Sequence, residues 1–172
     1  PPRSTLFPYT TLFRSFCLNG DWNLLLTRRT ETVNDHKGQV SFPGGAYEPE
    51  DISPEITALR EAQEEIGLHQ SDVTILGRLP SQPTISKYLI TPVVGRIPYG
   101  YPFQLSADEV ERVFSIPFSW LRNPAHHEEK LYRSGDGIDH WVTFFQIYDG
   151  ETLWGISAKI TILLLKKLKL ME

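Results

Sequence analysis

The sequence predicts an α/β protein in which a mixed sheet lies between two helices. Residues 54–66 place apolar side chains at helical spacing, and so does an apolar stripe along residues 156–168. Residues 73–79 and 88–97, between those helices, are apolar runs bounded by turn signals, a pattern typical of strands. We expect further strands at 16–18, 22–27, 40–42, 113–116, 131–133 and 141–148, a turn at 43–45 and a helical turn at 117–121.

The bulk properties limit the class of protein. A chain of 172 residues is long enough for one domain with a substantial core. Its formal charge of −4 gives no electrostatic case for binding nucleic acid, and no apolar run reaches the length of a membrane span. A single cysteine, Cys17, excludes an internal disulfide and fits a reducing compartment, so we expect a cytoplasmic protein. The sequence assigns no oligomeric state.

The helix at residues 54–66 has clear boundaries. Ser53 is a suitable N-cap, Pro54 suits the first helical position, and Glu55 complements the helix dipole. Gly67 then ends the helix. These local signals predict both ends of the element that carries most of the chemistry.

Three carboxylates crowd one side of this helix. Glu61 lies three residues from Glu64 and four from Glu65, which makes them neighbours on the helix surface. Arg60 offsets only part of their repulsion, whereas a hard divalent cation such as Mg²⁺ prefers carboxylate oxygens. The alternative for such a run of charges is a solvated acidic face.

The order of residues around these acids resembles a known motif. From Gly38 to Leu68 the chain reads GQVSFPGGAYEPEDISPEITALREAQEEIGL. It resembles the Nudix box, G-x5-E-x7-R-E-U-x-E-E-x-G-U with U apolar. Asp51 fills the first acidic position after Gly45, and eight residues rather than seven separate it from Arg60. The resemblance implies a Nudix-type α/β/α sandwich.

The residues upstream of the box narrow the resemblance. Residues 25–29, LLTRR, and 36–45, HKGQVSFPGG, look like the coenzyme A diphosphatase branch of the Nudix family. Thr30 replaces the usual Ser or Ala, and Asn34 stands where that branch has Arg. The branch implies metal-dependent hydrolysis of coenzyme A or acyl-CoA to 3′,5′-ADP and (acyl-)4′-phosphopantetheine.

The resemblance also implies the roles of the acidic residues. Glu61 and Glu65 are the first candidate ligands for Mg²⁺ or Mn²⁺, followed by Glu64, and the Gly45 carbonyl is a candidate backbone ligand. Arg60 is expected to orient the glutamates by ion pairing. Catalysis is assigned to Arg60, Glu61, Glu64 and Glu65 together, without a choice of general base.

Substrate contacts are expected upstream of the box. Arg28 and Arg29 suit phosphate through their planar guanidinium groups, although an exposed strand end explains the pair equally well. His36 beside Gly-Gln is a candidate ligand contact, with a solvated loop histidine as the alternative. Gly44 and Gly45 let the backbone approach phosphate or metal closely.

Later in the chain, residues 106–111 are acidic and residues 123–129, NPAHHEE, predict a polar loop. Glu128 or Glu129 is a candidate late acid near the metal, with simple solvation as the alternative. His126 and His127 have no third partner at zinc-like spacing.

The start of the chain has an unusual origin. Residues 5–15, TLFPYTTLFRS, are the translation of a common short-read sequencing adapter. We therefore expect residues 1–15 to be a non-native tail and residues 16–172 to form one Nudix domain. Residues 1–9 should be irregular, residues from about 11 should join only the edge of the sheet, and deleting 1–9 should change the melting temperature little.

Three alternatives stay open. The chain is a Nudix hydrolase of another nucleoside diphosphate derivative such as ADP-ribose or NADH, or a non-catalytic nucleotide-binding Nudix domain. Alternatively, the chain as written does not fold stably, because its first strand derives from the adapter. In each catalytic case the partner is a small molecule.

Overall fold

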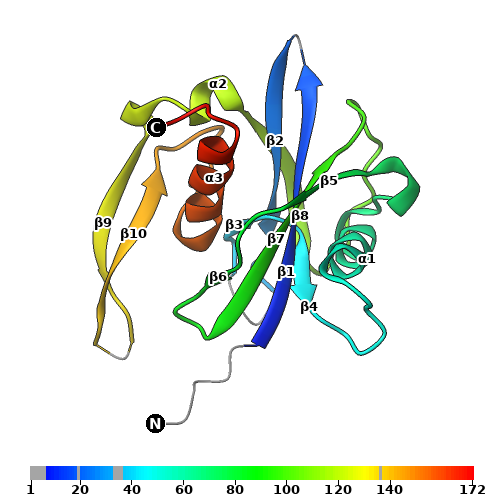
Figure 1. Cartoon of the computed structure of the whole chain (residues 1–172), viewed down its shortest axis with the longest axis horizontal. Coiled ribbons are helices and arrows are strands. Elements are labelled where there is room, and N and C mark those ends of the chain that lie inside the picture. Colours follow the sequence, from blue (N-terminus) through cyan, green and yellow to red (C-terminus); the bar gives the residue numbers. More distant parts are fainter. Residues whose placement is uncertain (1–6, 19, 33–36, 136) are drawn as a thin grey trace.

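The computed structural model describes residues 7–18, 20–32, 37–135 and 137–172. It confirms the α/β fold: a mixed sheet has helix α1 on one face and helix α3 on the other (Figure 1). The helices are α1 Pro54–Ile66, α2 Phe118–Leu121 and α3 Gly155–Lys167, with 3₁₀ turns at Gln70–Asp72 and Pro124–His126. The strands are β1 Phe7–Leu18, β2 Asp21–Arg29, β3 Val40–Ser41, β4 Gly44–Ala46, β5 Thr74–Arg78, β6 Gln82–Pro83, β7 Tyr88–Arg96, β8 Val110–Pro117, β9 His127–Arg133 and β10 Asp139–Phe145.

The main sheet follows the order β3-β2-β1-β7-β5. Strand β1 pairs antiparallel with β2 and β4 and parallel with β7, which makes the sheet mixed. Strand β8 pairs with β2, and β6 pairs with β7. Strands β9 and β10 form a separate two-stranded sheet.

The position of β1 corrects the expectation for the start of the chain. The strand begins at Phe7, where an irregular tail was expected, and it lies between β2 and β7 rather than at an edge. Its parallel register with β7 runs from Phe7 opposite Tyr88 to Ser15 opposite Arg96. Backbone groups pair whatever their side chains, so a segment of any origin can fill this position. The non-native origin of residues 1–15 stays a prediction.

Helix α1 has the predicted boundaries. The Ser53 hydroxyl accepts a hydrogen bond from the Ile56 N–H at 3.4 Å, and Pro54 occupies the first turn. Gly67 ends the helix at φ 66°, a left-handed conformation that costs glycine no steric strain. Because these signals are local, the sequence was sufficient to predict the element.

Strand β2 contributes side chains to two clusters of the hydrophobic core, one on each face of the sheet. Leu24 and Leu26 are fully buried in the cluster that includes α3, whereas Leu25 belongs to the cluster that includes Ile66 of α1. Successive side chains of a strand point to opposite faces. The same alternation separates the two arginines that follow, Arg28 and Arg29.

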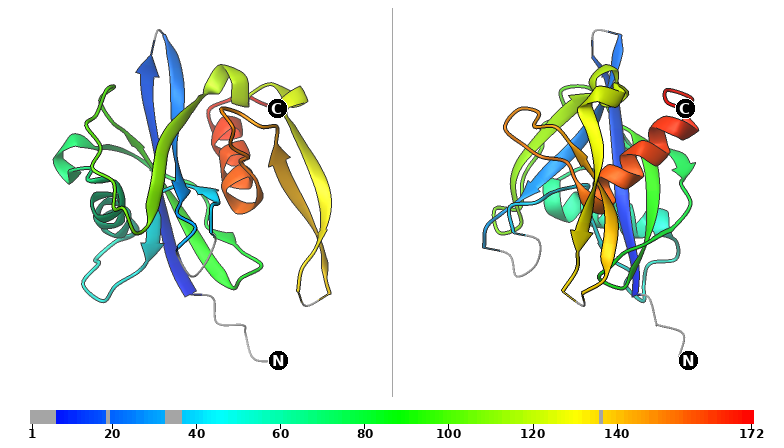
Figure 2. Two further views of the ribbon diagram at one scale, coloured as in Figure 1. Left: turned by 180° about the vertical axis from the view of Figure 1, so that it is seen from behind. Right: turned by 90° about the vertical axis from the view of Figure 1, so that its left-hand side faces the viewer.

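The last third of the chain differs in part from the expected pattern. The predicted loop at 123–129 is only a 3₁₀ turn, after which His127 already begins β9. Helix α3 buries Ile160 and Leu164 as predicted, but Leu168 follows the end of the helix and is 48% exposed. The β9–β10 hairpin lies on the far side of α3 from the sheet (Figures 1 and 2). Within the described ranges, no helix is long and apolar enough to cross a membrane.

Candidate active site

The site begins where β4 meets α1. Gly44 and Gly45 lie in β4, opposite Thr11 and Thr10 of β1, so the predicted turn at 43–45 is wrong for these two residues. A Cβ atom on Gly45 would lie 2.1 Å from Oε1 of Glu61, closer than any real contact. Glycine at this position therefore allows the Glu61 carboxylate to rest against the β4 backbone.

Glu65 occupies the interior of the same junction. Its side chain is only 4% exposed, and its Oε1 lies 3.5 Å from Nη1 of Arg29. The Gly44 N–H donates a hydrogen bond to Oε2 at 3.3 Å. Buried carboxylates need such partners, because removing the charge from water is costly. Arg29 and Gly44 thus fix the second carboxylate beside the first.

Arg60 connects most of the remaining acids. Its Nε and Nη2 donate to the two oxygens of Asp51 at 3.3 and 3.0 Å. Its Nη1 donates to Glu61 at 2.9 Å and to Glu64 at 3.2 Å, and its Nη2 also donates to the Ala46 carbonyl at 3.0 Å. The hydrogen bond from Arg60 lowers the pKa of Asp51 despite its burial. Asp51 therefore fixes the position of the Arg60 guanidinium, and Arg60 in turn positions the Glu61 carboxylate.

The electrostatic state of Glu61 differs from that of Asp51. Burial raises the pKa of Glu61, Arg60 opposes that increase, and the charges of Glu64 and Glu109 add to it. A raised pKa means that the ionised form lacks sufficient compensation by positive charge. Glu109 lies in the acidic stretch at 106–111 that the sequence analysis noted, but the sequence did not indicate that its charge acts on Glu61.

A divalent cation fits this donor set. Within residues 7–18, 20–32, 37–135 and 137–172, no three Asp, Glu, His or Cys side chains gather as a metal site. Mg²⁺ commonly uses only one or two carboxylates and completes its shell with water and substrate phosphate. Glu61 and Glu65 supply two carboxylates on one face of α1, whereas Glu64 is 57% exposed on its outer side.

The other candidate residues lie elsewhere. Arg28 points to the α3 face of the sheet, where it pairs with Glu31, Glu111 and Glu151 at 3.4, 3.1 and 3.4 Å. His36 lies outside the described residues. Glu128 and Glu129 are exposed residues of β9, on the α3 side of the molecule, which agrees with solvation and not with the alternative of a late acid near the metal.

The candidate histidines of the same region are also accounted for by packing. The ring of His126 stacks on Trp120 with centroids 4.4 Å apart, and that of His127 packs against Phe145 at 5.4 Å. Both rings therefore belong to the aromatic packing around the start of β9.

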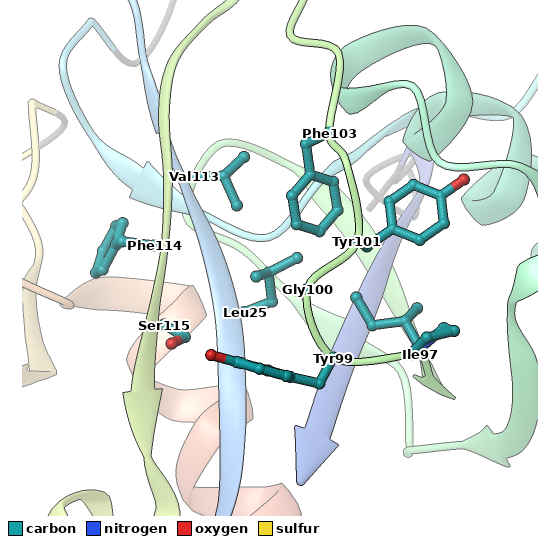
Figure 3. A pocket seen from close by; sticks show the side chains of 10 residues that line it. Leu25, Ile97, Tyr99, Gly100, Tyr101, Phe103, Val113, Phe114 and Ser115 are labelled. Atoms are coloured by element: carbon teal, nitrogen blue, oxygen red, sulfur yellow. The ribbon is translucent and has the colours of Figure 1, made fainter. Parts of the chain in front are cut away.

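An apolar pocket of about 240 Å³ opens beside α1 (Figure 3). Tyr99, Tyr101 and Phe103 line it from one side, and Leu25 of β2 and Val113 of β8 line it from the other. The sequence analysis missed this pocket, although the aromatic run YGYPF at 99–103 was a visible signal.

The segment that forms one wall of the pocket is hydrogen-bonded to helix α1. The Gln104 N–H donates to the Ile66 carbonyl at 3.0 Å, and the Ser106 N–H donates to the Glu65 carbonyl at 2.9 Å. The same segment therefore connects the pocket with the C-terminal end of α1.

Known proteins are similar to this chain in sequence and in fold. Residues 10–147 match the NUDIX domain model. Over 138 residues the chain is 41% identical to the uncharacterized Nudix hydrolase NudL of Escherichia coli. The aligned region covers 80% of this chain and 70% of that protein. The protein of the same name from Escherichia fergusonii has the same identity over the same length.

Solved structures agree in fold. The MutT/nudix family protein from Enterococcus faecalis superposes with a TM-score of 0.62 at 18% identity, over 98% of this chain and 64% of that chain. A C. elegans Ap4A hydrolase binary complex gives a TM-score of 0.55 at 18% identity, over 66% of this chain and 82% of that chain. At such identity the likeness shows the fold alone.

Together the fold and the sequence relatives define a hydrolase of phosphorus-containing anhydrides. The chain belongs to the Nudix family.

Proposed function

We propose that this enzyme hydrolyses the diphosphate bond of coenzyme A or acyl-CoA, giving 3′,5′-ADP and (acyl-)4′-phosphopantetheine. One observation carries the proposal. Gly44 and Gly45, which end the upstream run that resembles the coenzyme A diphosphatase branch, lie against the box carboxylates Glu61 and Glu65. The two sequence signals are therefore parts of one site.

Each side chain has a role in this proposal. Glu61 and Glu65 hold Mg²⁺ or Mn²⁺, which when bound neutralises the diphosphate and lowers the pKa of a coordinated water. Arg60 positions Glu61, and Arg29 positions Glu65. Glu64, the most exposed of the three glutamates, holds water at the rim of the site. Gly45 keeps the space that the Glu61 carboxylate occupies.

The aromatic pocket supports an extended substrate. Leu25 in its wall and Arg29 at the carboxylates point to the same face of β2, four residues apart. Four strand residues span about 13 Å. A substrate with a diphosphate at Arg29 and an extended arm reaching the pocket matches this separation. Coenzyme A has such an arm in its pantetheine, and an acyl-CoA adds an apolar acyl chain.

The location and the chain start complete the proposal. A single cysteine supports a reducing compartment, the cytoplasm. Residues 1–15 derive from an adapter, and residues 16–172 are the native Nudix domain. Sequencing the locus from its source tests the last point, because an unchanged reading of residues 5–15 in uncloned DNA would contradict it.

The main experiment is turnover of coenzyme A with Mg²⁺, with the products resolved by mass. We expect kcat/KM for coenzyme A to exceed that for ADP-ribose by at least about tenfold, or about 1.4 kcal/mol. Asn34→Arg should increase the ratio further. A preference for ADP-ribose would move the enzyme to another Nudix substrate class, and binding without turnover of any diphosphate would make it a non-catalytic domain.

A further inference from the structure

The β9–β10 hairpin presents an unpaired strand edge. Within the described part of the chain, β10 is the only strand that pairs with β9. The hairpin is anchored on α3 through Phe144, whose ring stacks on Trp154 with centroids 5.4 Å apart and planes 6° apart. Strand β9 is therefore held at the side of the molecule with its outer edge exposed (Figures 1 and 2). Exposed edges are templates for pairing with another strand.

The backbone pattern identifies which residues face outward. The Ser134 N–H donates to Ile138 at 2.9 Å at the turn, and the Gln146 N–H donates to His126 at 2.8 Å at the other end. Hydrogen-bonded and non-bonded pairs alternate along an antiparallel ladder. Leu131, which is opposite Trp141, therefore stands in a non-bonded pair, as do Glu129 and Arg133. Their N–H and C=O groups point to the free edge.

The side chains at that edge are self-complementary. Leu131 is 57% exposed and lies beside Trp141, which is 69% exposed. Glu129 and Arg133 carry opposite charges two residues on either side of Leu131. Arg133 is 70% exposed and pairs with Asp139 at 2.9 Å, an exposed contact that contributes little and is easily exchanged.

We propose that two copies of this chain associate through antiparallel pairing of their β9 strands, with the two-fold axis at Leu131. Leu131 then meets Leu131 of the second copy, and Glu129 of each copy meets Arg133 of the other. Each of these pairs exchanges two backbone hydrogen bonds, because all three residues have outward-facing groups. The result is a four-stranded sheet in the order β10-β9-β9-β10.

Other registers of the same strand are less favourable. An axis at Lys130 would place two lysines opposite each other and Glu129 opposite Leu131, so it would have neither an apolar centre nor pairs of opposite charge. The register centred on Leu131 alone combines free backbone groups, an apolar centre and opposite charges. The interface is separate from the proposed catalytic site, since Arg29 and α1 lie on the other side of the sheet from α3.

The test is the mass of the full chain in solution as a function of concentration. Sedimentation velocity from about 1 to about 300 μM should show the 19.7 kDa monomer giving way to a species of twice that mass at micromolar concentrations, as expected for a small interface. A monomer across the whole range would overturn the proposal.

Charge exchange tests the register. Glu129→Arg alone places two arginines opposite each other at both ends of the interface, and Arg133→Glu alone does the same with two glutamates, so each variant should weaken self-association at least about tenfold. An equimolar mixture of the two variants restores both opposite-charge pairs and should recover the dimer. Any effect of Arg133→Glu on the nearby Asp139 is common to the single variant and the mixture.

The matched control is Glu128→Arg, the same change one residue away. Glu128 turns its backbone toward β10 and its side chain to the opposite face of the hairpin, so dimer formation should be unchanged. A dimer that survives Glu129→Arg, or a mixture that stays monomeric, would contradict this register. Diphosphatase turnover should be the same in all these variants, which keeps the outcome independent of the proposed function.

Discussion

Arg28 and Arg29 are neighbours in the sequence, but they belong to different parts of the molecule. Arg29 reaches Glu65 on the α1 face of the sheet at 3.5 Å, whereas Arg28 reaches Glu151 on the α3 face at 3.4 Å. Strand alternation separates them. Only Arg29 therefore lies with the box carboxylates, although the sequence suggested the same phosphate contact for both.

The two faces also balance their buried charges differently. On the α1 face, Asp51, Glu61 and Glu65 have side chains no more than 15% exposed, and their ion pairs within the described residues are with Arg29 and Arg60. These ion pairs join three buried carboxylates to two arginines, a deficit of positive charge among the described pairs. Such a deficit favours a bound cation, which is the condition that metal-dependent hydrolysis requires.

On the α3 face the buried carboxylate of Glu151 has two cations. Arg28 and Arg112 each approach Oε1 of Glu151 at 3.4 Å, and the Glu151 side chain is 7% exposed. The charge of Glu151 raises the pKa of Arg28, which is consistent with an ion pair that stays formed. The comparison teaches that a buried acid indicates a metal site only where the surrounding arginines do not compensate it.

The largest expected effect tests this difference directly. Glu61→Gln should reduce kcat at least about 100-fold, because it removes a proposed metal ligand worth several kcal/mol. Glu151→Gln, the matched change on the α3 face, should leave kcat of the folded enzyme within about twofold. Steady-state assays with Mg²⁺ measure both, and a near-normal rate for Glu61→Gln would remove it from the ligand set.

The second effect concerns stability. An exposed helix face would make Glu65→Gln nearly neutral, but Glu65 is buried against Arg29. Removing its charge leaves a half-buried arginine without its anion, which should cost about 2 kcal/mol of unfolding free energy. Urea titrations of Glu65→Gln and Glu64→Gln compare the buried and exposed positions, and equal midpoints would show that the Arg29 pair is not stabilising.

A smaller loss of activity should follow from Gly45→Ala. The added methyl displaces the Glu61 carboxylate, a flexible group, so the fold should persist while kcat falls about tenfold. Gly135→Ala is the control, since nothing lies within 4 Å of its added Cβ. Unchanged turnover in Gly45→Ala would mean that the position of Glu61 against β4 is unimportant for catalysis.

The smallest effect is expected for an exposed ion pair, Glu55 with Arg78, which serves as a reference for the buried pairs on both faces. The hydrogen bond from Arg78 lowers the pKa of Glu55 from 4.5 to about 2. A lowered pKa gives stability that is present above about pH 4.5 and is lost as the pH falls toward 2. Glu55→Gln should therefore lose less than about 1 kcal/mol at pH 7 and nothing at pH 2. Melting curves at both pH values check this, and a loss that persists at pH 2 would point to packing instead.

The structure also reverses one expectation about truncation. Because Phe7, Pro8 and Tyr9 pair with Tyr88, Leu89 and Ile90 of β7, deleting residues 1–9 removes the end of a central strand. We now expect a melting temperature lower by several degrees. An unchanged value would show that this end of β1 contributes nothing to stability.

The sequence by itself determined the features that depend on neighbouring residues. The cap at Ser53, the stop at Gly67 and the crowding of Glu61, Glu64 and Glu65 all follow from spacing within one helix. The strands expected at 131–133 and 141–148 and the apolar stripe along 156–168 were predicted from local patterns of the same kind.

Only the tertiary structure decided which of these residues meet. No local pattern in the sequence shows that β4 lies against α1 or that Arg60 donates hydrogen bonds to Asp51. Nor does it show that Arg29, rather than Arg28, faces Glu65. Each depends on pairing between segments far apart in the chain, and on which face of the sheet a helix covers. Such contacts form because the whole chain buries its apolar surface at once, which no single stretch of residues specifies.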